Sequence, residues 1–258
     1  MRISRDGKRH NSVQMKGCIM AHFIEEPSQN KGVAKLFGIF FIITFLAYGV
    51  GTGIVESIIG KPDMLAQIFA DKTNLVIGAL LMSIVHTLMN IGLVVIMFCI
   101  IKPFNKFLSY GYLSVGLGAT VLLAVGAIFL LLLVPLSEMH SASLDSGNAG
   151  FDSLAIVLSK GNFYAYQVGM SIWGMGGLML SYVLFKSVLV PRVISVALAI
   201  GYLVFITGTI AELFGYPIGV MFSIPGGLIE ITLSIWLIIK GFDYSKAHAS
   251  ETSSLGQV

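Results

Sequence analysis

The sequence predicts an all-α polytopic membrane protein with six transmembrane helices, and three observations support this fold class. Hydrophobic residues make up 56% of the 258 residues and charged residues only 11%, whereas soluble domains carry roughly 25% charged residues. Six stretches are long and apolar enough to cross a bilayer, for which a helix needs about 20 residues. Lysine and arginine gather on one side of the predicted membrane. Most of the chain is therefore expected to face lipid or protein and not water.

The chain divides into a membrane domain between two polar tails. Residues 1–31 are polar and basic, and we expect a disordered cytoplasmic tail there. Residues 32–242 hold the six spans, and residues 243–258 form a second polar tail. Thirteen Lys and Arg residues fall on the side of the tails, and three fall on the other: Lys61, Lys72 and Lys160. This imbalance predicts that both termini are cytoplasmic.

The first two spans are predicted at residues 32–57 and 74–101. In the first span, three glycines at close spacing allow a neighbouring helix to approach: Gly49, Gly51 and Gly53. Between the spans, Lys61-Pro62-Asp63 ends the first helix, and Asp63 can cap the segment MLAQIFA. Seven residues are too few to cross a bilayer, so we expect a short extracytoplasmic helix.

The third and fourth spans are predicted at residues 108–136 and 163–186, on either side of the longest loop. The third span is apolar and is expected mainly to pack. In the loop, Asp152 can cap a second short extracytoplasmic helix, which Gly161-Asn162 would end. Three aromatic residues of the fourth span are expected to pack or to lie at the membrane interface: Trp173, Tyr164 and Tyr166.

The last two spans are predicted at residues 191–214 and 218–240. Pro191 suits the first turn of the fifth helix. The last span contains Pro225-Gly226-Gly227, a candidate helix break, because proline removes one helix hydrogen bond and crowds the preceding turn. Broken helices line solute sites in many transporters. A plain kink is the alternative, since packed neighbours can satisfy the freed backbone groups.

Three segments carry a resemblance to a known family: LFKSVLVPR at residues 184–192, IEITLSIWLIIKGF at residues 229–242, and NLVIGALLMSIVHTLMNIGLVVI at residues 74–96, followed by Gly111-Tyr112-Leu113. Over residues 32–242 the chain resembles a family of small bacterial integral membrane proteins, a domain of unknown function in the four-thousand series. The resemblance implies a six-span protein in the bacterial cytoplasmic membrane and no particular reaction. Members often carry a basic and an acidic residue early in the third span, and residues 114–119 have neither.

Glu230 and His86 are the ionisable residues that we place near the bilayer centre. A bare charge there costs at least ~2.5–3.5 kcal/mol on insertion scales, so Glu230 needs a partner. Each residue is twelve positions from the outer end of its span, or roughly 18 Å. We predict that the two meet or share a water inside the bundle, with Asn90 and Ser83 on the same helix face as His86. The pair either only joins two helices, at about 0.6 kcal/mol, or forms a ligand or proton site.

Glu56 and Glu212 lie near the outer ends of their spans. They form a candidate acidic mouth that attracts cations, or they are simply solvated helix ends. The sequence has no Walker loop, no HExxH and no paired haem histidines, so we predict no metal and no cofactor. No basic and aromatic pattern indicates nucleic acid. The expected partners are the lipid bilayer and, if the central site binds one, a small-molecule ligand.

Function follows less directly than fold from this sequence. No nucleophile and base lie together at one depth, so an enzyme is not predicted. The sequence favours a non-enzymatic sensor, accessory subunit or scaffold. The alternative is a small-molecule or ion carrier with a midplane site around Glu230 and His86. A carrier needs a polar cavity that reaches the midplane from one side, whereas a scaffold is expected to have a dry, filled core.

Overall fold

The computed structural model describes residues 27–143 and 149–244, and this part of the chain is helical without any strand. Nearly all of the predicted N-terminal tail and of the tail at 243–258 lies outside the described residues. The first helix begins at Pro27, so it includes the last residues of the predicted tail.

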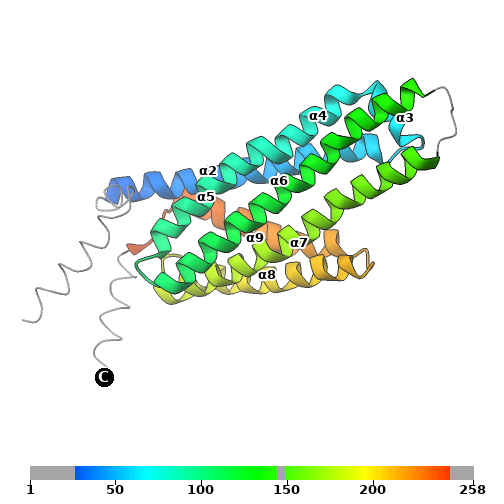
Figure 1. The fold of residues 1–258 in the computed structure, drawn as a ribbon. Coiled ribbons are helices and arrows are strands. Elements are labelled where there is room, and N and C mark those ends of the chain that lie inside the picture. The colour runs from blue at the N-terminus through cyan, green and yellow to red at the C-terminus, as the bar shows by residue number, and fades with distance from the viewer. Residues whose placement is uncertain (1–26, 144–148, 245–258) are drawn as a thin grey trace, which may run out of the picture.

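Six helices in the described part of the chain are long and apolar enough to cross a membrane, and Figure 1 shows them bundled together. The third span ends six residues later than predicted, and the fourth begins about a dozen residues earlier, at the start of α7. The other four spans lie close to their predicted bounds. The elements in chain order are α2 (Pro27–Ile59), α3 (Met64–Ala70), α4 (Lys72–Leu80), η2 (Leu81–Val85), α5 (His86–Ile101), α6 (Lys106–Ala142), α7 (Ala149–Ser187), α8 (Arg192–Leu213) and α9 (Gly219–Ile239). Here α4, η2 and α5 together form the second span, and η2 is a turn of π-helix within it. The protein is a multi-pass membrane protein.

The two predicted short helices have different outcomes. The first is present as α3, although Asp63 makes no capping hydrogen bond through its side chain. The second is wrong as a separate element, because α7 runs unbroken from Ala149 through Gly161 and Asn162. A Cβ on Gly161 would lie 2.9 Å from the ring of Phe129 on α6. This glycine therefore serves close packing between α6 and α7 and does not end a helix.

The six spans form a closed ring. Each span packs against its neighbours in the sequence, and α9 packs against α2 to complete the ring. Figure 1 shows α6 and α7 running past α8 and α9 toward the end of the bundle that carries α3, as expected from their greater length. We call this the α3 end, and the opposite one the loop end, after the loop between α5 and α6.

Two apolar clusters fill the two ends of the ring. The loop-end cluster includes buried residues from every span, among them Phe37, Met97, Tyr112, Leu184, Leu198 and Leu237. The α3-end cluster includes Val55, Ile68, Leu75, Leu133 and Ala155, and among the described residues it has no member from α8 or α9. In a bilayer such clusters are held by close packing and not by exclusion from water. His86 and Asn90 follow Met82 of the α3-end cluster along the second span and precede Leu93 of the loop-end cluster.

Candidate functional site

Glu230 lies on the face of α9 that points into the ring. The buried residues of this helix include Gly226, Leu233 and Leu237, and Glu230 follows Gly226 by four positions and precedes Leu233 by three. Residues at these spacings share one helix face. The carboxylate is therefore directed toward the bundle interior and not toward lipid.

Two donors from neighbouring helices meet one oxygen of this carboxylate. The Tyr202 hydroxyl of α8 donates to Glu230 Oε1 at 2.5 Å, and the Trp173 indole Nε1 of α7 donates to the same oxygen at 3.4 Å. Hydrogen bonds to a charged acceptor are about twice as strong as those between neutral groups. The hydrogen bonds and the ion pair found among the described residues do not involve Oε2, and the side chain is partly buried. One oxygen is thus fixed, and the other is open to a ligand or a proton.

Tyr202 reaches Glu230 because a glycine leaves room for its ring. A Cβ on Gly177 of α7 would lie 2.3 Å from ring atoms of Tyr202, so any side chain there would displace the phenol. Trp173 precedes Gly177 by four positions on the same helix and therefore lies one turn away. The sequence of α7 thus sets both donors beside α9.

The predicted helix break is wrong, because α9 continues as one helix through Pro225, Gly226 and Gly227. Gly226 instead lies against Gly201 of α8, where a Cβ would come within 3.1 Å of the Gly226 Cα atom. Small residues allow membrane helices to approach at this distance. The glycine of this segment brings α9 close to the helix that carries Tyr202.

His86 lies in a different cluster from Glu230. Its side chain is 5% exposed, and its ring meets Tyr48 of α2 edge-on, with centroids 5.0 Å apart. Tyr48 in turn stacks on Tyr166 of α7, with centroids 5.6 Å apart. His86 Nδ1 has no hydrogen-bond partner. The predicted direct contact with Glu230 is wrong, since equal depth does not fix the face, and α9 packs between α2 and α8 while α5 packs between α2 and α6.

The other polar residues predicted for the second span separate as well. Asn90 Nδ2 donates to Thr120 Oγ1 at 2.6 Å and so joins α5 to α6. Ser83 donates to the Ala79 carbonyl of its own helix at 2.7 Å. Ser83 lies inside the π-helical turn, which changes the number of residues per turn. The α-helical rule that residues three or four positions apart share a face therefore does not apply between Ser83 and His86.

Tyr166 also differs from its predicted place. It was expected at the membrane interface, and instead its ring stacks inside the bundle on Tyr48. It lies seven positions before Trp173, the donor to Glu230, on the same face of α7. Tyr166 is therefore a link between the central carboxylate and the α3 end.

The two acids of the predicted outer mouth take different environments. Glu212 Oε1 accepts the Gly219 backbone N–H at 2.8 Å, which satisfies one of the free donors at the start of α9. Glu56 is exposed on α2. No hydrogen bond or ion pair between described residues joins them, and the acidic mouth stays a prediction.

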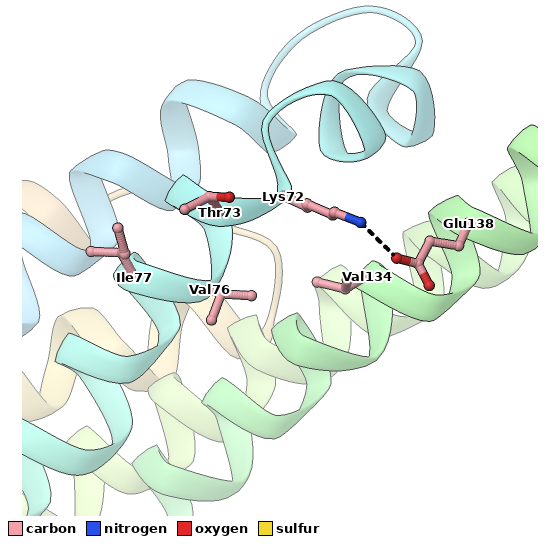
Figure 2. A pocket seen from close by; sticks show the side chains of 6 residues that line it. All are labelled: Lys72, Thr73, Val76, Ile77, Val134 and Glu138. Atoms are coloured by element: carbon pink, nitrogen blue, oxygen red, sulfur yellow. Dashed lines mark hydrogen bonds and ion pairs between the residues drawn. The ribbon is translucent and has the colours of Figure 1, made fainter.

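A shallow pocket at the α3 end lies apart from this site (Figure 2). Figure 2 shows Lys72 of α4 reaching across to Glu138 of α6, where Nζ and Oε1 are 3.0 Å apart. Both side chains are about half exposed, 51% and 49%. Exposed ion pairs contribute about 0–1 kcal/mol, so this pair joins two helices at the surface and adds little more.

Sequence reasoning missed both donors of Glu230. Tyr202 comes ten positions after the start of α8 at Arg192, and Glu230 comes nine positions before the end of α9 at Ile239. Because these helices are antiparallel neighbours, the two residues lie at matching depth. Counting from the loop end would have paired them, whereas counting from the α3 end paired Glu230 with His86.

No curated protein and no solved structure matches this chain. The family described as Domain of unknown function (DUF4386) matches residues 36–241, from the first turns of α2 to the end of α9. This confirms the resemblance found in the sequence. The protein, a membrane protein whose described part has six apolar helices long enough to cross a bilayer, therefore belongs to the DUF4386 family.

Proposed function

We propose that the protein is a small-molecule or ion carrier, not an enzyme, and that its solute binds at Glu230 as a cation. The observation that carries the proposal is the inward-facing carboxylate, in which both hydrogen bonds between described residues go to Oε1 and none goes to Oε2. An acid at membrane depth is costly and in most proteins serves a function. Here that cost would be offset when a cation or a proton occupies Oε2.

The neighbours of Glu230 favour a positively charged solute. Tyr202 and Trp173 donate hydrogen bonds to the carboxylate from α8 and α7. No Lys or Arg of the described residues hydrogen-bonds to Glu230 or pairs with it. The negative charge is thus left for the solute.

A sensor, accessory or scaffold role is the second candidate. The apolar clusters at both ends of the ring favour it, because a closely packed interior leaves little space for a solute to pass. A sensor would bind a cation at Glu230 without carrying it across. A scaffold would bind none, and Glu230 would only join α9 to α7 and α8.

For the setting, we propose the bacterial cytoplasmic membrane with the α3 end outside. Lys61, Lys72 and Lys160 are the basic residues toward the α3 end, while the loop end carries Lys102, Lys106, Lys186, Arg192 and Lys240. The positive-inside rule then places the loop end in the cytoplasm. Reporter fusions after residues 60 and 104 would test it, and a cytoplasmic signal from the first would contradict it.

Thermal stability in detergent tests binding. The full chain would be melted with sodium, potassium, tetramethylammonium or tetraphenylphosphonium chloride, in wild type, Glu230→Gln and Glu138→Gln. A ligand at 100 times its Kd adds about 2.7 kcal/mol, which is roughly 5–10 °C for a chain of this size. We expect one cation to stabilise wild type and Glu138→Gln and to leave Glu230→Gln unchanged. A shift that survives in Glu230→Gln would remove the site from this carboxylate.

Proteoliposomes then separate the two candidates. Uptake of the stabilising cation that is lost in Glu230→Gln is the result expected of a carrier. Binding without uptake would support the sensor. The absence of a shift with every probe would leave the scaffold role and overturn the carrier.

A further inference from the structure

Between the two apolar clusters lies a layer of buried polar atoms without partners. Among the described residues, the atoms of this layer that lack a hydrogen bond are Thr44 Oγ1, His86 Nδ1, Thr87 Oγ1, Asn162 Nδ2 and Gln167 Oε1. His86 and Gln167 are 5% and 6% exposed. An unsatisfied polar group at membrane depth costs several kcal/mol, and internal water commonly meets such groups in proteins. We call these residues the polar layer.

An aromatic row connects part of this layer to Glu230. Thr44 lies one turn before Tyr48 on α2. Tyr48 contacts His86 edge-on and stacks on Tyr166. Tyr166 lies two turns before Trp173 on the same face of α7, and Trp173 donates to Glu230. These side chains form a polar route from the α3 end to the carboxylate.

The π-helical turn η2 sets the position of His86 in this row. It covers Leu81–Val85 and ends directly before His86. π-helix occurs mostly as single turns inside α-helices, and such turns are frequent at functional sites. Here the turn directs an imidazole with a free nitrogen into the interior, against Tyr48.

The two ends of the ring differ in how many spans contribute to the apolar cluster that fills them. The loop-end cluster includes residues from all six spans, whereas the described part of the α3-end cluster has none from α8 or α9. The contact between α2 and α9 changes along its length. A Cβ on Gly38 would lie 2.7 Å from the Ser234 carbonyl, and one on Gly227 would lie 3.7 Å from Phe45, but one on Gly49 would meet nothing within 4 Å. The two helices thus separate toward the α3 end.

We infer that Glu230 exchanges protons with the α3 end alone, along a route of water and polar groups beside Thr44, Tyr48, His86 and Tyr166. A proton from water near Glu56 enters this route and ends on Glu230 Oε2. The loop-end cluster blocks the other side in this state. The inference rests on the proposed function, because it assigns the access route of the same site.

The charge that changes in this exchange belongs to Glu230. The titratable groups that interact with it are phenols on three helices: Tyr112 of α6, Tyr166 of α7 and Tyr202 of α8. On α2, the other helix packed on α9, the half toward the α3 end carries Tyr48 and Glu56. Phenols ordinarily stay neutral near pH 7. An optical change at Trp173 after a pH jump therefore reports the carboxylate.

Trp173 supplies the probe for the test. The chain has two tryptophans, so Trp236→Phe leaves only the indole that donates to Glu230. In this background, stopped-flow fluorescence after a jump to acid pH gives an amplitude and a rate. The variants are Glu230→Gln for the site, Tyr166→Phe and Thr44→Val for the route, and Tyr182→Phe as the matched control. Tyr182 is an exposed tyrosine of the same helix as Tyr166.

We expect Glu230→Gln to lose the amplitude. Tyr166→Phe and Thr44→Val keep the amplitude and slow the rate by about tenfold or more, since a lost relay group removes a proton-transfer step. Tyr182→Phe matches the parent in both. Parent rates in both route variants would overturn the access route and leave the proposed site intact. An amplitude that persists in Glu230→Gln, or no amplitude in the parent, would overturn the site and the route together.

Discussion

Tyr202 and Glu230 are joined by a hydrogen bond of 2.5 Å across the contact between α8 and α9. Trp173 adds a longer bond to the same oxygen from α7. Three consecutive spans thus converge on one carboxylate oxygen and leave the other oxygen of the pair without a donor. This arrangement is the basis of the predictions below.

Removing the Tyr202 hydroxyl is expected to destabilise the protein and to change the state of Glu230. Tyr202→Phe keeps the ring on Gly177 and deletes only the donor. Hydrogen bonds to charged groups contribute about 1.5–3 kcal/mol, so a clear fall in the melting temperature is expected. The carboxyl band of Glu230 in the infrared spectrum, assigned with Glu230→Gln, would shift. An unchanged band would contradict the bond.

Gly177→Ala is expected to disturb the site from a distance of one helix. The new Cβ would lie 2.3 Å from the Tyr202 ring, and overpacking of this kind costs typically about 1–3 kcal/mol. Gly118→Ala on α6 is the matched control, because a Cβ there meets nothing within 4 Å. Melting curves and Trp173 fluorescence would be compared. Equal behaviour of the two alanine variants would show that Tyr202 is not held by this contact.

The bond between Asn90 and Thr120 is expected to have a modest effect. A double-mutant cycle with Asn90→Ala and Thr120→Ala isolates the coupling between α5 and α6. Side-chain hydrogen bonds in membrane proteins average about 0.6 kcal/mol and reach about 1.7 kcal/mol. The short distance of 2.6 Å places this bond toward the upper value. A coupling of zero in reversible unfolding would contradict it.

Glu212 is expected to hold the start of α9. Glu212→Ala leaves the Gly219 N–H without its acceptor, and loss of a helix cap costs about 0.5–2 kcal/mol. Hydrogen exchange at the first amides of α9 would become faster, while Glu56→Ala, on an exposed acid of α2, would leave it unchanged. Faster exchange in both variants would point to a general effect of charge near the α3 end.

The spans could be predicted from the sequence because hydrophobic length is a property of each segment alone. The bounds of α8 and α9 lie within a few residues of the prediction for this reason. The short helix α3 could be predicted in the same way, because a segment of seven residues is too short to cross a bilayer. Local composition carries all of this information.

The misses share one cause, which is contact between helices. Gly161 marks a helix end by composition, yet the ring of Phe129 explains it as a packing site. Gly226 resembles part of a break, yet Gly201 of α8 lies against it. The partners of Glu230 depend on which faces of α7, α8 and α9 meet. The depth of a residue in the bilayer does not say toward which neighbouring helix its side chain points. The π-turn before His86 shifts the faces further.

The position of α9 in the ring bears on how the site comes into being. This helix is the last of the six along the chain. Its main packing partners among the described helices are α8 and α2. If the spans enter the bilayer in the order of synthesis, Trp173 and Tyr202 are already in place when Glu230 arrives. The Glu230 carboxylate then forms its hydrogen bonds as α9 enters the bilayer and is not left without donors in the hydrocarbon region. In that order, the insertion of α9 closes the ring of helices and also completes the surroundings of the Glu230 carboxylate.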